Sequence, residues 1–116
     1  TMVGGGYDHC FVIDRGRGAS QSLCAWASSD KTGISMKVYT TQPGVQLYTG
    51  NFLQDCPAPG KGSVPMQKYG GFALETQHFP CSPSHPEFPS TALRAGKVFR
   101  ANTTLRFFTG KQCGKL

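Results

Sequence analysis

The sequence predicts an all-β protein built from antiparallel strands, and three observations support this prediction. The chain of 116 residues contains 15 glycines and 8 prolines, a composition typical of many turns and few long elements. No segment keeps apolar residues at helical spacing, whereas several short runs alternate apolar and polar residues as strands do. The length suffices for one domain with a modest core and is too short for two.

The chain before residue 41 contains three expected strands. Residues 7–13 alternate so that Asp8 lies on the face opposite Tyr7 and His9. A hairpin of residues 22–28 and 34–40 is the clearest supersecondary signal, because the connection between them contains Asp30 and ends at Gly33. In its second strand, the side chains expected to form a buried face are Ile34, Met36 and Val38.

The remaining expected strands follow a turn at residues 41–44. Residues 45–48 form a short strand in which Gln46 and Tyr48 share one face. Residues 79–89 contain four prolines, so this extended segment cannot be a central strand and is expected to cross the surface of a sheet. Alternation from 98 to 108 predicts a half-buried antiparallel strand.

The balance of charge allows two interpretations. The formal net charge is +6, and half of the basic residues follow Glu87, after which there is no acidic residue. A basic end can attract nucleic acid or an anionic surface. These charges are not clustered with exposed aromatic residues in a known nucleic-acid motif, so the pattern favours a scattered solvated face and no nucleic-acid partner.

The five cysteines are an odd number at wide, irregular spacings, without a CxxC pair or a cysteine–histidine grouping of zinc-site type. This pattern predicts free thiols in a reducing compartment. No apolar run is long enough to span a membrane, and no basic and apolar leader is present. The expectation is a cytoplasmic protein without a membrane partner.

One carboxylate stands inside a short apolar run, at Glu75 within residues 70–80. Read as a strand, this run places Phe72, Leu74 and Thr76 on one face and Glu75 on the other. A carboxylate backed by apolar residues is expensive to bury and suits a general base. The segment taken by itself favours a salt-bridged or solvent-facing strand glutamate over a general base.

Four blocks of sequence, at residues 6–11, 40–53, 71–77 and 85–89, strongly resemble the galactose mutarotase (aldose 1-epimerase) family in order and spacing. They read GYDHCF, TTQPGVQLYTGNFL, GFALETQ and HPEFP. The block through Pro43, Gln46 and Asn51 is the most specific of the four. The resemblance covers nearly the whole chain, but it corresponds only to the carboxy-terminal third or so of a typical family member.

This resemblance implies part of a galactose-mutarotase-like β-sandwich, or supersandwich, that interconverts the α and β anomers of hexoses such as galactose and glucose. It implies no metal and no cofactor. By the same resemblance, Glu75 corresponds to the general base, Asp8 to the residue that holds sugar hydroxyls, and Gln46 to a residue of the sugar site.

The expected organisation is a single partial domain over residues 1–116, because the chain begins on Thr1 and has no counterpart of the family's general-acid histidine. His9, His78 and His85 are each expected to be structural or surface residues. The isolated chain is therefore expected to have little activity. The alternative is a non-catalytic β module that binds carbohydrate or protein, with self-association through uncovered sheet edges.

Overall fold

The computed structural model describes residues 5–16 and 20–109, and it confirms the all-β prediction. The described residues contain no α-helix and only three short 3-10 turns, η1 (Leu53–Asp55), η2 (Lys61–Ser63) and η3 (Ser82–Ser84). None of these turns is long and apolar enough to cross a membrane. The six strands are β1 (Asp8–Val12), β2 (Ser22–Ser28), β3 (Ile34–Thr40), β4 (Gly44–Tyr48), β5 (Ala73–Gln77) and β6 (Thr103–Thr109).

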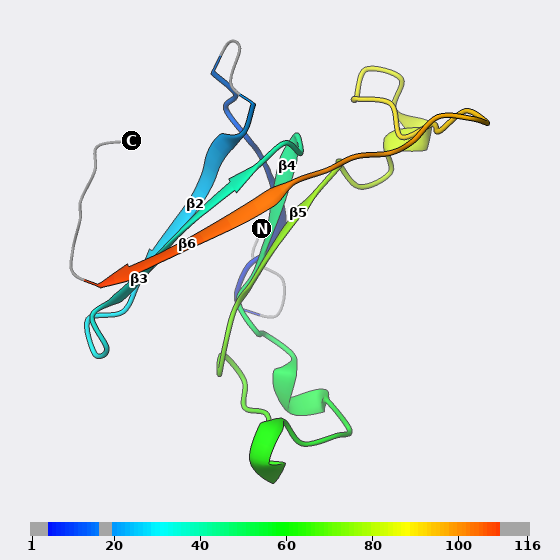
Figure 1. Ribbon diagram of the computed structural model, residues 1–116. Helices are drawn as coiled ribbons and strands as arrows, with labels where there is room; N and C mark the ends of the chain where they lie inside the picture. The colour runs from blue at the N-terminus through cyan, green and yellow to red at the C-terminus, as the bar shows by residue number, and fades with distance from the viewer. Residues whose placement is uncertain (1–4, 17–19, 110–116) are drawn as a thin grey trace.

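The strands form two antiparallel sheets of three strands each (Figure 1). One has the order β1-β4-β5 and the other the order β2-β3-β6, so each sheet has one central strand. The central strands β3 and β4 follow one another in the sequence, with only residues 41–43 between them. This short connection joins the two sheets into a sandwich-like arrangement.

The predicted hairpin is confirmed as β2 and β3, whose register runs from Ser22 opposite Thr40 to Ser28 opposite Ser35. Its connection ends in Gly33, which has a φ of +69° and donates its amide hydrogen to the Ser29 carbonyl at 2.8 Å. A glycine suits this position because side chains with a Cβ rarely adopt such a backbone conformation.

The last predicted strand is antiparallel, but the prediction of its extent and of its burial is wrong. Pairing between β3 and β6 starts at Thr40 opposite Thr103, so residues 98–102 lie upstream of the sheet although they continue the alternation. The prediction of a half-buried strand also fails, because the side chain of Phe107 is 66% exposed. Alternation alone does not show whether a neighbouring strand or layer exists to cover a face.

Burial in the described residues is concentrated at a few points. The buried hydrophobic side chains are Ile13, Val38 and Val45. The predicted buried face of β3 is therefore only partly correct, since Val38 is 2% exposed but Ile34 is 49% exposed. Ile34 begins β3 and pairs with the last residue of β6, so it lies at the open end of the sheet.

Hydroxyl groups connect the two sheets where β3 passes into β4. The Thr40 side chain is completely buried and donates its hydroxyl to the Asn102 carbonyl at 3.2 Å. At the same junction the hydroxyls of Thr76 in β5 and Thr103 in β6 lie 2.6 Å apart. Figure 1 shows β6 approaching the strands of the other sheet at its beginning. A hydrogen bond between strands of different sheets therefore helps to fix their relative position.

Candidate functional site

The three residues predicted for the site lie on one face of the β1-β4-β5 sheet. Gln46 in the central strand is directly opposite Glu75 in β5 and opposite Cys10 in β1. Asp8 lies two residues before Cys10 on the same strand, and therefore on the same face. We call this face, which presents Asp8, Gln46 and Glu75, the site face.

Gln46 connects the site face across two strands. Its Nε2 amide donates a hydrogen bond of 2.8 Å to Oδ1 of Asp8. The other amide atom, Oε1, is buried and has no hydrogen-bond partner among the described residues. Because buried polar atoms are almost always paired, this oxygen is an acceptor suited to a donor that arrives with a ligand.

The two carboxylates of the site face are accessible. Asp8 and Glu75 are both solvent-exposed, and Gln46 between them is half-buried. The exposed Glu75 agrees with a strand glutamate that faces solvent, an alternative that the sequence left open. Ionised carboxylates and an amide oxygen only accept hydrogen bonds, so this face suits a ligand with several hydroxyl donors.

A buried asparagine, Asn51, fixes the start of β1, a structural role that its place in the sequence block did not indicate. The side chain of Asn51 has no exposed surface, accepts the Thr49 hydroxyl at 2.7 Å and donates to the Tyr7 carbonyl at 3.0 Å. The Tyr7 amide in turn donates to the Thr49 hydroxyl at 2.8 Å. Gly6 is required here, because a Cβ at this position would collide with the Asn51 side chain. These contacts hold the chain directly before Asp8.

The described histidines lie away from the site face. His9 is on the opposite face, as alternation predicted, where its ring lies 5.8 Å from that of Tyr7. His85 belongs to the proline-containing segment, and its Nδ1 atom lies 2.9 Å from Oε1 of Glu87. The ring of His78 lies 6.3 Å from that of Phe99. No described histidine therefore stands beside Glu75 on the site face.

An aromatic ring covers one end of the site face. Gly44 in β4 pairs with Val12 and Gln77, and a Cβ built on it would lie 3.0 Å from the ring of Phe79. The same Cβ would lie 2.9 Å from Sγ of Cys10. Gly44 is buried, and its lack of a side chain leaves the space that the Phe79 ring occupies.

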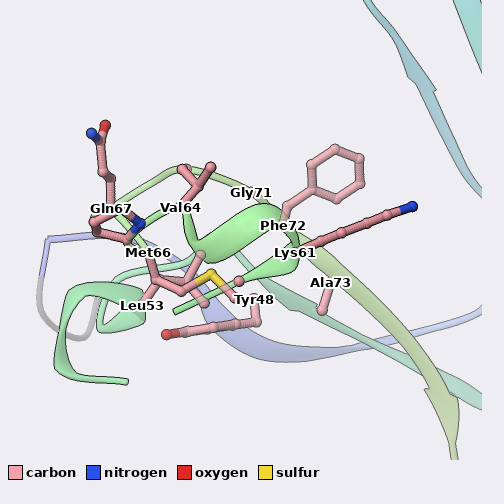
Figure 2. A pocket seen from close by; sticks show the side chains of 12 residues that line it. Tyr48, Leu53, Lys61, Val64, Met66, Gln67, Gly71, Phe72 and Ala73 are labelled. Atoms are coloured by element: carbon pink, nitrogen blue, oxygen red, sulfur yellow. The ribbon is translucent and has the colours of Figure 1, made fainter. Parts of the chain in front are cut away.

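A cleft adjoins the site face without containing its polar residues (Figure 2). It has a volume of about 610 Å³ and is formed mainly by residues 60–73. Tyr48 and Ala73 line the cleft and pair with each other across β4 and β5, and Tyr48 also pairs with Asp8 of β1. Figure 2 shows Leu53 and Met66 beside Tyr48 in this cleft. Asp8, Gln46 and Glu75 do not line the cleft, so the candidate site rests on their shared sheet face.

The thiols and metal-binding groups give no further site within residues 5–16 and 20–109. That part of the chain holds no group of three or more histidine, cysteine or acidic side chains suited to a metal ion. Cys10, Cys24, Cys56 and Cys81 are free thiols, while Cys113 lies outside the described residues. Burial raises the pKa of the Cys24 thiol, which donates to the Val38 carbonyl at 3.3 Å.

Comparison with known proteins shows which family the chain resembles along its length. Residues 2–106 match the family model described as aldose 1-epimerase. The galactose mutarotases of Rattus norvegicus and Homo sapiens are each 40% identical to the chain over 102 residues, and the aldose 1-epimerase of Escherichia coli strain K12 is 38% identical over 105 residues. Each match covers 88% of this chain and 29% of the relative, so the chain spans less than a third of their length.

Proposed function

Because this chain belongs to the aldose 1-epimerase family, we propose that it supplies the general base and part of the sugar site of an enzyme that interconverts the α and β anomers of a hexose. Galactose and glucose are the proposed substrates, and no metal or cofactor takes part in the reaction. The chain is proposed to form one part of a larger aldose 1-epimerase domain, in accordance with the fraction of its relatives that it spans.

The observation that carries this proposal is the arrangement of three side chains around Gln46. Its amide is hydrogen-bonded to Asp8, while Glu75 lies directly opposite on the neighbouring strand. A hexose presents hydroxyl groups at adjacent carbons, so one sugar can donate to several acceptors that lie side by side on a sheet. Asp8 and Gln46 then hold sugar hydroxyls and orient the anomeric carbon toward Glu75.

Anomer exchange requires one base and one acid. Glu75 removes the proton from the C1 hydroxyl while an acid protonates the ring oxygen, and the C1–O5 bond breaks to give the open-chain aldehyde. Rotation about the C1–C2 bond exposes the other face of the carbonyl, and ring closure with the reverse proton transfers gives the other anomer. The acid is proposed to come from the part of the enzyme that lies outside this chain.

The base assignment is tested by polarimetry of freshly dissolved α-galactose with the full-length enzyme. Glu75→Gln keeps the size of the side chain but removes the base, and we expect the rate to fall about 100- to 10,000-fold. Glu87→Gln is the matched control, since Glu87 is exposed and lies against His85 rather than on the site face. An active Glu75→Gln enzyme would contradict the base assignment.

The isolated 116-residue chain provides the second arm of this test. We expect it to leave the mutarotation rate close to that of buffer, because the site face carries a base and no described acid partner. Rapid mutarotation by the chain alone would contradict the proposal that the acid comes from elsewhere.

The reducing, cytoplasmic location predicted from the cysteines belongs to the same proposal and is supported by the four free thiols of the described residues.

A further inference from the structure

The ring of Phe79 lies on the site face at Gly44. The pair formed by Gly44 and Gln77 is the next one on this face after the pair formed by Gln46 and Glu75. Side chains two residues apart on a strand point to the same face, so a side chain at Gly44 would stand beside Gln46. The position of that absent side chain is 3.0 Å from both Cδ1 and Cε1 of Phe79. The ring therefore occupies the end of the face that Gly44 leaves open, next to Sγ of Cys10.

Neighbouring groups hold this ring in place. Phe88 contacts it edge to face, with ring centroids 5.1 Å apart and an angle of 75° between the planes. His85 stacks on Phe88 at 4.8 Å. The backbone is fixed as well, because the buried Ser82 donates its hydroxyl to the Phe79 carbonyl at 2.6 Å. Phe79 as a whole residue is half-buried.

We propose that Phe79 is a specificity-determining residue that forms the apolar platform of the hexose site, and this inference rests on the proposed function. A pyranose ring has hydroxyl edges and C–H faces. Asp8, Gln46 and Glu75 offer acceptors to the hydroxyls, while the electron-rich face of an aromatic ring favours C–H groups, which carry small positive partial charges. The two kinds of surface lie side by side here.

This arrangement predicts a preference between two sugars that differ only at C4. In galactose the C4 hydroxyl is axial, which gathers the C–H groups of C3, C4 and C5 on one face of the ring. In glucose the same C–H groups are divided between both faces. A single aromatic platform therefore contacts galactose over a larger apolar area than glucose, and Phe79 is expected to favour galactose.

The test compares the affinity of the chain for methyl β-galactoside and methyl β-glucoside, measured by NMR titration. Glycosides are used because their anomeric centre is fixed and cannot react. A pair of aromatic rings gains about 0.5–1.5 kcal/mol beyond its buried area. On the same scale for the C–H face of a sugar, Phe79→Leu should weaken galactoside binding about 3- to 10-fold. The glucoside affinity should change about twofold or less, which lowers the ratio between the two sugars.

Two further variants separate a role in recognition from a role in folding. Gly44→Ala adds a methyl group 3.0 Å from the ring and should displace it, so the galactoside preference should fall in this variant too. Phe99→Leu is the control, because Phe99 is 60% exposed and its ring contacts His78 rather than the site face. The ratio should remain unchanged in this control.

If the ratio of galactoside to glucoside affinity is unchanged in Phe79→Leu, the inference is overturned. This holds even if the variant unfolds at a lower temperature, because Phe79 would then contribute to packing alone. Failure of the unaltered chain to bind methyl β-galactoside overturns it as well. The proposed function is decided separately, because the polarimetric comparison of Glu75→Gln with the full-length enzyme does not depend on Phe79.

Discussion

Replacing Asn51 with alanine should destabilise the chain and loosen the start of β1 directly before Asp8. The substitution removes the acceptor for the Thr49 hydroxyl at 2.7 Å and the donor to the Tyr7 carbonyl at 3.0 Å. A buried polar group left without a partner costs about 1–3 kcal/mol. The Tyr7 carbonyl keeps the hydrogen bond from the Thr49 amide at 3.0 Å, and the same carbonyl lies 3.3 Å from the Thr49 hydroxyl as a second acceptor for it. The cost is therefore reduced, and we expect a total loss of about 1–2 kcal/mol.

The free energy of unfolding is measured by urea titration followed by circular dichroism, and hydrogen exchange at the Thr49 amide reports the local effect. This amide donates to the Tyr7 carbonyl at 3.0 Å, so its protection should fall in Asn51→Ala. Asn102→Ala is the matched control, because its side chain is exposed and its backbone makes the hydrogen bonds to Thr40 and Thr41. A loss below about 0.5 kcal/mol in Asn51→Ala, or one equal to that of the control, would refute this reasoning.

Two further predictions concern the thiols and the junction between the sheets. Mass spectrometry after brief alkylation at pH 8 should find Cys56 and Cys81 modified before Cys24. Both are exposed, while burial raises the pKa of Cys24 and so lowers its thiolate fraction. Equal rates would contradict the burial of Cys24. Thr103→Val removes the hydroxyl that lies 2.6 Å from the Thr76 hydroxyl and should cost about 0.5–1 kcal/mol in urea unfolding. Thr109→Val, at an exposed position of the same strand, is the control, and an equal effect in both variants would argue against a role of this contact.

The parts of the fold that the sequence predicts correctly depend on neighbours along the chain. Alternation places the side chains of Asp8 and His9 on different faces of β1. It also places Glu75 on the face of β5 that does not carry Leu74 and Thr76, and the register agrees with both. The hairpin of β2 and β3 is likewise a local feature, since Asp30 and Gly33 in its connection signal the turn.

The parts that sequence reasoning missed depend on contacts between distant segments. The burial of Asn51 requires Tyr7 and Gly6, which lie at the same end of the site sheet but more than 40 residues away along the chain, and neither the spacing nor the composition of these residues indicates that they meet. The extent of β6 depends on where β3 ends, which the alternation after residue 98 cannot show. The contact of Phe79 with Gly44 is hidden for the same reason, although a glycine inside a strand is a usable signal of close approach.

The order of the strands has a consequence for how the chain acquires its structure during synthesis. All strands of the site sheet have been translated once Gln77 has left the ribosome, so this sheet can assemble early. The other sheet needs β6, which ends at Thr109 and pairs with a strand that begins at Ile34. Pairing over such a separation pays a large loop-closure entropy and is slow. Until β6 is available, the β2-β3 hairpin therefore has an unpaired edge on β3 in addition to the edge of β2, which stays open in the finished sheet. This interval is when the nascent chain is most prone to aggregate.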